Sequence, residues 1–159
     1  MEMRPMRRVK QQMTEEECRG LLKMVMRGTL AFSESEGYPY ALPINFYYDE
    51  EKNVLMFHGA LSGKKSELLK EGAPVCFTGW DDGYKKEGDW AYTVNSIMVF
   101  GRIHVATEEE EKIDILRKLG CKYYPTMEEV DEALEKNKAR ACGFWMTIDH
   151  LTGKTVHEK

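Results

Sequence analysis

Apolar residues recur first at the spacing of a helix and then at the spacing of strands. The capping-box sequence Thr14-Glu15-Glu16-Glu17 predicts the start of a helix, and Gly28 is expected to end it. The apolar face of this helix consists of Cys18, Leu21, Leu22 and Val25. Polar turn sequences then separate three strand-like runs, over residues 29–33, 40–48 and 54–58. We expect these runs to form an antiparallel meander.

The middle of the chain is expected to contain a short helix and then longer strands. The helix is predicted over residues 62–70, closed by Gly72, and a strand over 73–80. The charged residues 81–89 indicate an exposed loop. One long strand or two follow over residues 90–105, where the apolar face consists of Ile97, Val99, Gly101, Ile103 and Val105.

The last third of the chain returns to helices. Capping boxes at 107–110 and 126–129 each predict a helix of about a dozen residues. A strand is expected over 142–148, and Thr152-Gly153-Lys154 is expected to form a turn before the tail. Because most connections are of hairpin length, this order favours a mainly β fold, an antiparallel barrel with flanking helices, over a doubly wound parallel sheet.

The length of the chain, 159 residues, fits a single domain. We expect residues 1–159 to form it, with 1–12 as an N-terminal arm and 107–140 as a helical insertion. The arm is basic, because it contains Arg4, Arg7, Arg8 and Lys10. Such an arm is either solvated, or one of its arginines folds back onto an anionic ligand or a partner subunit.

Charge and composition narrow the range of partners. The net charge of −4 disfavours non-specific nucleic-acid binding, which needs many Lys and Arg side chains. No apolar run approaches the roughly 18 residues that span a bilayer, and no apolar stretch follows the basic start as in a signal peptide. We therefore expect a cytoplasmic protein without a nucleic-acid or membrane partner. The cysteines lack the spacing of a zinc site and are expected to be buried reduced thiols: Cys18, Cys76, Cys121 and Cys142.

A pair of lysines stands at the start of the predicted short helix. Lys64 and Lys65 lie where a helix carries partial positive charge, which is mildly unfavourable unless an anion binds there. Ser62 as N-cap and Gly63 as a small residue suit a phosphate cradle. The alternative is a solvated helix start.

Two further features do not follow from folding alone. Pro43 interrupts a good strand pattern and cannot donate to a sheet, so the strand is an edge there or a flat ligand takes the place of a partner strand. His58-Gly59-Ala60 ends a strand with two small residues, which allow close approach of a ligand. His58 could bind that ligand, act as an acid or base, or be purely structural.

In order along the chain, these sequences resemble a known family. The matching motifs are Met6-Arg7-Arg8, Gly37-Tyr38-Pro39-Tyr40, Pro43-Ile44-Asn45-Phe46, Phe57-His58-Gly59-Ala60, Gly63-Lys64-Lys65, Leu68-Leu69, Val99-Phe100-Gly101-Arg102 and Thr152-Gly153-Lys154. Together they are similar to the Nim-type nitroimidazole-resistance proteins of the pyridoxamine 5′-phosphate oxidase-like superfamily, which bind FMN in a split β-barrel. The ordered set is specific, although no single motif is.

The resemblance implies a homodimer with FMN at the subunit interface. Residues 42–45 would contact the isoalloxazine ring through their backbone, and Ser62 and Lys64 would hold the phosphate. The strand 99–102 would approach the flavin or line the interface. His58 is the implied catalytic residue, and the implied cofactor-binding set is Leu42, Pro43, Ile44, Asn45, Phe57, His58, Gly59, Ala60, Ser62, Gly63, Lys64, Lys65, Val99 and Arg102.

Two departures from the oxidase itself change the expected chemistry. Gly63 stands where the oxidase has an arginine, and residues 144–150 lack its arginine-containing substrate motif. We therefore expect not vitamin B6 oxidation but an FMN-dependent oxidoreductase that passes electrons to small acceptors such as nitroaromatics. NAD(P)H or another donor would bind transiently, since no G-x-G-x-x-G sequence is present. The alternatives are a non-catalytic flavin or haem binder, acting as sensor or carrier, and a cofactor-free dimeric interaction domain.

Overall fold

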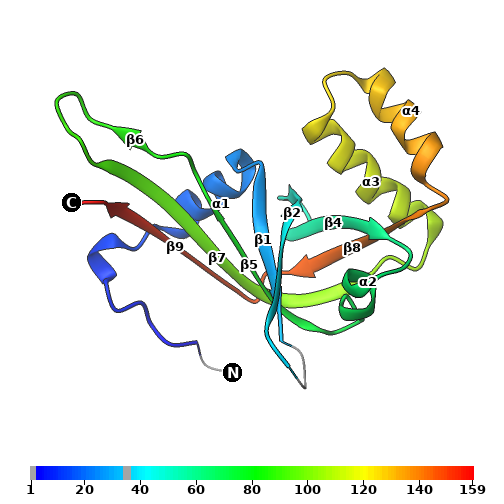
Figure 1. Cartoon of the computed structure of the whole chain (residues 1–159), viewed down its shortest axis with the longest axis horizontal. Helices are drawn as coiled ribbons and strands as arrows, with labels where there is room; N and C mark the ends of the chain where they lie inside the picture. Colours follow the sequence, from blue (N-terminus) through cyan, green and yellow to red (C-terminus); the bar gives the residue numbers. More distant parts are fainter. Residues whose placement is uncertain (1–2, 34–36) are drawn as a thin grey trace.

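The computed structural model describes residues 3–33 and 37–159, and it consists of one strongly curved sheet with helices around it (Figure 1). All pairings are antiparallel, in the order β2-β1-β5-β7-β8-β4-β3, with β6 and β9 also paired to β7. The strands are β1 (Arg27–Phe32), β2 (Tyr40–Asn45), β3 (Tyr47–Asp49), β4 (Val54–Ala60), β5 (Pro74–Trp80), β6 (Tyr84–Lys85), β7 (Tyr92–Val105), β8 (Ala141–Thr147) and β9 (His150–His157). The predicted mainly β, antiparallel barrel with flanking helices is confirmed.

The helices begin close to the predicted capping boxes. They are η1 (Val9–Gln11), α1 (Glu15–Met24), α2 (Lys64–Leu68), α3 (Glu109–Tyr123) and α4 (Met127–Asn137). The Thr14 hydroxyl accepts from the N–H of Glu17 at 3.2 Å, and the Glu17 carboxylate accepts from the N–H of Thr14 at 2.7 Å. Thr126 likewise caps α4. α3 begins one residue later than expected, after Glu108, without a side-chain cap.

The strand expected over residues 40–48 is in fact two strands, so the predicted three-strand meander is wrong. β2 pairs with β1 and β3 pairs with β4, at opposite ends of the strand order. The strand is interrupted at Phe46. The N–H of this residue donates to the Tyr123 hydroxyl of α3 at 2.9 Å instead of to a neighbouring strand. The Phe46 ring packs on Phe77 with the ring centroids 4.5 Å apart. A distant tyrosine and a core aromatic therefore decide where the strand ends.

The turn expected at Thr152-Gly153-Lys154 is also wrong, because these residues lie inside β9. Gly153 pairs with Ile97 of β7. A Cβ on Gly153 would meet the sulfur of Cys18 at 2.4 Å, so this glycine serves the close packing of α1 on the sheet. Residues 81–89, expected as a loop, contain the short strand β6.

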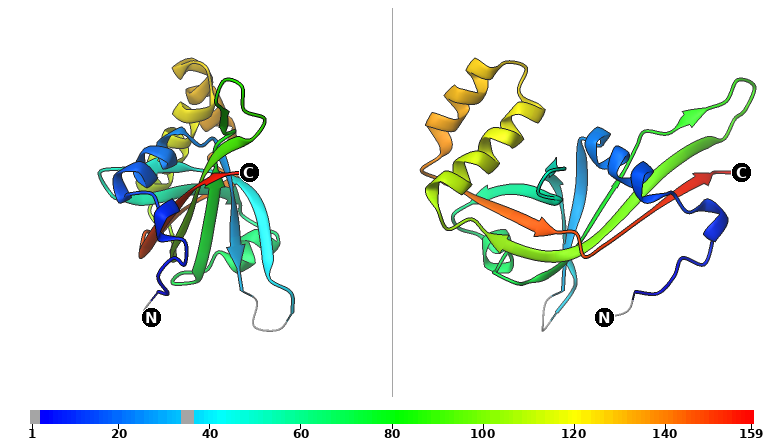
Figure 2. Two further views of the ribbon diagram at one scale, coloured as in Figure 1. Left: turned by 90° about the vertical axis from the view of Figure 1, so that its left-hand side faces the viewer. Right: turned by 180° about the vertical axis from the view of Figure 1, so that it is seen from behind.

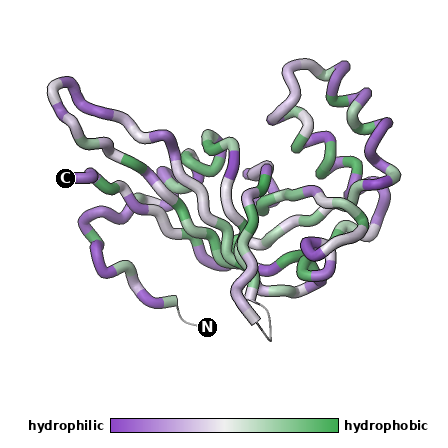
Figure 3. The backbone as a smooth tube through the Cα atoms, viewed as in Figure 1, coloured by the Kyte–Doolittle hydropathy of each residue, from purple (hydrophilic) through white to green (hydrophobic). Residues whose placement is uncertain are grey.

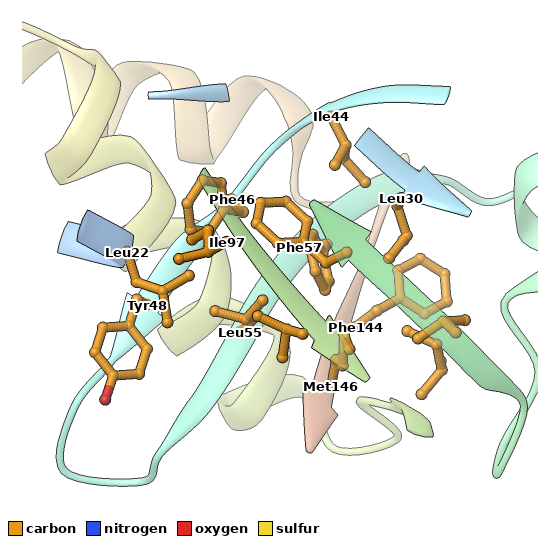
Figure 4. Close-up of a cluster of buried hydrophobic side chains, with 14 of the residues drawn as sticks. Leu22, Leu30, Ile44, Phe46, Tyr48, Leu55, Phe57, Ile97, Phe144 and Met146 are labelled. Carbon is orange, nitrogen blue, oxygen red and sulfur yellow. The ribbon is translucent and has the colours of Figure 1, made fainter. Parts of the chain in front are cut away.

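The core fills the concave side of the sheet. Phe46, Phe57, Leu22, Leu55 and Met146 are among its fully buried side chains (Figure 4). The predicted buried face of β7 is confirmed, because alternate residues from Ile97 to Ile103 are buried. In the hydropathy-coloured view, hydrophobic and hydrophilic segments alternate along α3 and α4 (Figure 3).

The N-terminal arm lies far from the helical hairpin. α3 and α4 stand at one end of the sheet, whereas the arm and the C-terminus lie at the other (Figure 2). Gln12 forms a bridge with Lys154 of β9, and the basic residues of the arm are exposed: Arg4, Arg7, Arg8 and Lys10. Within one chain, none of these arginines folds back onto the hairpin end.

The prediction of four buried thiols is correct for Cys18 alone. Burial raises the pKa of Cys18 to about 11, which keeps the thiol neutral. Cys76 and Cys142 are half-buried, and Cys121 is exposed on α3. Each of the four is a free thiol.

Candidate functional site

A pocket of about 730 Å³ lies between the end of β4 and the α3–α4 hairpin. The sheet side of the pocket is formed by Asn45, His58, Gly59, Ala60, Lys65 and Ala141. The helical side is formed by Leu116, Leu119, Gly120, Tyr123, Tyr124, Val130, Ala133, Leu134, Asn137 and Arg140. Five residues of the predicted flavin site therefore meet here: Asn45, His58, Gly59, Ala60 and Lys65.

The alternation of side chains along β4 explains why His58 reaches this pocket. Leu55 and Phe57 point into the main core, while Val54 and Met56 pack under α3 with Ile115 and Leu119. His58 continues the α3-facing row two residues beyond Met56, and it is exposed. α3 therefore covers this face of β4 at the start of the strand. At the end of the strand, the same face lines the pocket.

The helix α2 is fastened to the end of β4. The Lys65 ammonium donates to the carbonyl of His58 at 2.8 Å, and the Ser66 hydroxyl donates to the carbonyl of Ala60 at 2.5 Å. Burial lowers the pKa of Lys65. These bonds place a cation at the floor of the pocket, beside the histidine.

The imidazole of His58 is held in its neutral form. Its pKa is lowered, first by the loss of water around the ring among the pocket walls and then by the charge of Lys65. Within the described part of the chain, the ring makes no hydrogen bond. A neutral ring can donate a hydrogen bond from one nitrogen and accept one at the other, so His58 is free to contact a ligand.

The start of α2 differs from the prediction. Gly63, not Ser62, is the N-cap, with a φ of 111° that favours glycine, and no side chain caps the helix. Ser62 is exposed beside it. The Lys64 ammonium lies 5.8 Å from the centroid of the Tyr40 ring, which brings the start of α2 next to β2.

The strand that contains Pro43 lies at an edge of the sheet, as both explanations of this proline require. Among the described residues, β2 pairs only with β1, and Pro43 itself is exposed. Ile44 is buried, Leu42 packs against the core, and Asn45 lines the pocket. The outer edge of β2 therefore lies open near Lys64.

Nine residues of the predicted flavin site do not line this pocket: six belong to β2 and the start of α2, and the other three lie elsewhere. The side chains of Phe57 and Val99 are fully buried in the core. Arg102 is exposed on β7, where its guanidinium donates to the carbonyl of Gly72 at 2.9 Å. None of these three side chains lines the pocket.

Sequence reasoning missed the whole helical wall, above all Tyr123. Its hydroxyl accepts from the N–H of Phe46 and donates to the carbonyl of Met26 at 2.5 Å. The neighbouring Lys122 donates to the carbonyl of Val25 at 2.7 Å, and its ammonium lies 3.8 Å from the centroid of the Phe46 ring. Burial lowers the pKa of Lys122 to about 8. The one available signal was the aromatic pair Tyr123-Tyr124 at the end of a predicted helix.

Across residues 3–33 and 37–159, no three His, Cys, Asp or Glu side chains gather as metal ligands would. In the same ranges, no helix has the length and apolarity to cross a membrane.

Solved structures share this fold at low sequence identity. A candidate 5-nitroimidazole antibiotic resistance protein of Bacteroides thetaiotaomicron is 20% identical with a TM-score of 0.70, over 91% of this chain and 85% of that one. An FAD and heme binding protein of Mycobacterium smegmatis is 22% identical with a TM-score of 0.73, over 94% and 74%. An FAD-binding protein of Mesorhizobium loti is 20% identical with a TM-score of 0.65, over 91% and 96%.

Sequence comparison identifies the family. No curated protein matches the chain in sequence. The profile of the family described as pyridoxamine 5′-phosphate oxidase matches residues 14–155, which include every strand and helix except η1 and the last residues of β9. The chain therefore belongs to the pyridoxamine 5′-phosphate oxidase family.

Proposed function

We propose that the chain binds FMN and acts as an FMN-dependent oxidoreductase that reduces small acceptors such as nitroaromatics. One observation carries this proposal: the open edge of β2, the lysines of α2 and a neutral histidine meet at one corner of the sheet. An edge strand offers backbone groups to the planar ring of FMN, and the Lys64 ammonium at the start of α2 attracts the phosphate.

The residues at this corner suit FMN. Gly63 presents no side chain toward the space above the start of α2, so a phosphate can approach the backbone there. Ser62 and Lys64 would hold that phosphate, and the backbone of residues 42–45 would face the ring system. FMN, when bound, supplies electron transfer in one- or two-electron steps.

The chain itself would position the acceptor and manage its proton. The apolar residues of α3 and α4 would shield a bound acceptor from water, and Asn45 can hydrogen-bond a polar substituent. His58 carries one proton on its neutral ring and can donate it toward the acceptor. NAD(P)H or another donor would bind transiently from solvent.

The proposal includes a homodimer with FMN at the subunit interface. The convex face of the sheet carries Cys76 and Thr78 of β5 opposite Phe100 and Met98 of β7, and Met98 is 43% exposed. Trp80, at the end of β5, is 56% exposed. An uncovered apolar face of this kind favours association with a second copy.

A second candidate function is a non-catalytic flavin or haem binder. The Mycobacterium smegmatis structure is named for both FAD and heme, and the neutral ring of His58 is the form that ligates iron. Absorbance spectra of the purified chain after mixing with hemin would separate this function from the first, because a sharp Soret band that His58→Ala removes indicates haem ligation.

The enzymatic proposal is tested by reduction of the bound flavin. We expect NADPH or NADH to bleach the flavin absorbance anaerobically, and a nitroaromatic to restore it over repeated cycles. His58→Ala should retain FMN and slow the second half of the cycle. A bound flavin that neither nucleotide reduces would contradict an NAD(P)H-dependent enzyme.

A further inference from the structure

The lining of the pocket between β4 and the α3–α4 hairpin contains two cationic side chains and no acidic one. Lys65 stands on the sheet side, and Arg140 follows the end of α4 on the helical side. We propose that this pocket binds a small aromatic acid, with its ring against the helical wall and its carboxylate held between Lys65 and Arg140. This inference rests on the proposed function, in which such an acid is the electron acceptor.

The surroundings of Lys65 favour an anionic ligand. Its ammonium donates to the carbonyl of His58, and within the described residues it forms no ion pair. A half-buried ammonium that meets only a carbonyl is poorly compensated for its lost hydration. A carboxylate in the pocket would supply the missing negative charge.

Within the described residues, Arg140 shares with Lys122 and Lys136 the absence of an ion pair, and of these three only Arg140 lines the pocket. Lys112, Arg117, Lys118 and Lys138 each pair with a carboxylate. Arg140 instead donates to the neutral side-chain amide of Asn137 at 3.1 Å and forms no ion pair in the described part of the chain. A guanidinium has five N–H donors, so one hydrogen bond leaves a fork that matches a carboxylate.

The rest of the pocket suits an aromatic ring. The helical wall presents Leu116, Leu119, Val130 and Leu134, and the Tyr123 and Tyr124 rings stand at its end. The volume of about 730 Å³ lies in the range of small-molecule sites, roughly 300–1,000 Å³. An apolar wall with a few charged groups binds a ring and orients its acid group.

Calorimetric titration with two matched probes tests the inference. 4-Nitrobenzoate and 4-nitrobenzamide have the same ring and similar size, but only the first is charged. We expect the purified chain, with and without added FMN, to bind the carboxylate about tenfold more tightly than the amide, the usual scale of a charge-assisted contact. Arg140→Gln and Lys65→Gln should each remove most of this preference. Lys136→Gln, which removes a charge from α4 outside the pocket lining, should keep it.

The outcomes separate this inference from the proposed function. Equal affinity for the two probes, or a preference that survives in Arg140→Gln, would overturn the inference. An Arg140→Gln variant that loses affinity for FMN in the same proportion would also overturn it, because the cations would then hold the cofactor's phosphate. A chain that discriminates the probes but never binds FMN would keep this pocket assignment and contradict the flavin proposal instead.

Discussion

Two hollows lie on opposite sides of α3, and their charges are arranged differently. The second, of about 600 Å³, is lined by Leu22, Lys23, Tyr47, Tyr48, Asp49, Glu50, Glu51, Lys118, Cys121 and Lys122. There Lys118 pairs with Asp49 and Asp114, and Lys23 pairs with Glu50. In the first hollow, Lys65 and Arg140 meet only a carbonyl and an amide. Lys122, the third cation of the second hollow, bonds a carbonyl and lies over a ring instead of a carboxylate. Lys23 and Lys118 are therefore neutralised within the chain, whereas Lys65 and Arg140 leave their charge available to a ligand.

The largest expected effect on stability comes from the removal of Asp49, the buried carboxylate of the second hollow. Asp49 is 4% exposed and accepts from the Lys118 ammonium at 2.6 Å. Burial alone would raise the pKa of Asp49, but the bonds from Lys118 and the N–H of Lys52 bring it below its usual range. Asp49→Ala should lower the free energy of unfolding by about 2–4 kcal/mol, since it removes a buried, hydrogen-bonded carboxylate and leaves Lys118 with Asp114 alone. Urea denaturation measures this loss.

The control for that variant is Glu51→Ala, which changes an exposed residue of the same hollow. Its unfolding free energy should change by less than about 0.5 kcal/mol. Similar losses in both variants would mean that the Asp49 pair contributes no more than surface charge.

The second effect on stability concerns Tyr123, whose hydroxyl connects the α3–α4 hairpin to Phe46, between β2 and β3. Tyr123→Phe leaves the N–H of Phe46 and the carbonyl of Met26 without their partner, so unfolding should become easier by about 1–2 kcal/mol. Tyr124→Phe is the control, because this neighbour is exposed and its hydroxyl makes no hydrogen bond within the described residues. Equal thermal stability of the two variants would contradict the role given to Tyr123.

A third effect develops only at alkaline pH and depends on Lys122. Its pKa is lowered from 10.5 to about 8 in the folded chain. Between these values the unfolded chain binds the extra proton, so this residue makes stability rise as the pH increases from about 8. Urea titrations of the wild type and of Lys122→Met across this range should diverge, and only the wild type should gain this increment. Parallel curves would show that Lys122 titrates normally.

The smallest expected effect is a pH dependence in the first hollow. Because desolvation and the charge of Lys65 lower the pKa of His58, the ring gains its proton below its ordinary pKa of 6.5. The added charge should then tighten binding of 4-nitrobenzoate between pH 7 and pH 5 by a few-fold, since two opposite charges at 4–6 Å attract modestly near a surface. His58→Gln should show a flat profile. A wild-type affinity that is constant over this range would contradict protonation of His58 beside the bound carboxylate.

The sequence allowed the local elements to be predicted well. Capping boxes mark the starts of α1 and α4 because Thr14 and Thr126 bond to residues three positions away. The break at Phe46 could not be predicted, since apolar alternation continues through it and its partner, Tyr123, lies 77 residues along the chain. The sequence around Gly153 predicts a turn, but this glycine lies in β9 and serves the packing of α1. A glycine required by close packing cannot be told from a turn glycine by the sequence alone.

Only the sheet side of the candidate site could be predicted, because sequence motifs link residues that are close along the chain. His58, Gly59, Ala60 and Lys65 are close in sequence, and the structure places them on one side of the pocket. The opposite wall comes from residues 116–140, and helical periodicity does not tell which part of a sheet a helix will cover. Phe57 and Val99 match the family's motifs, but the alternation of their strands turns them into the core.

Titration of the purified chain with FMN tests the central claim most directly. We expect bound FMN to be retained on a desalting column with its visible absorbance. Lys64→Ala should weaken binding by about 1–3 kcal/mol, and Lys70→Ala, an exposed neighbour beyond α2, should leave it unchanged. A chain that stays colourless after mixing with FMN would contradict the account.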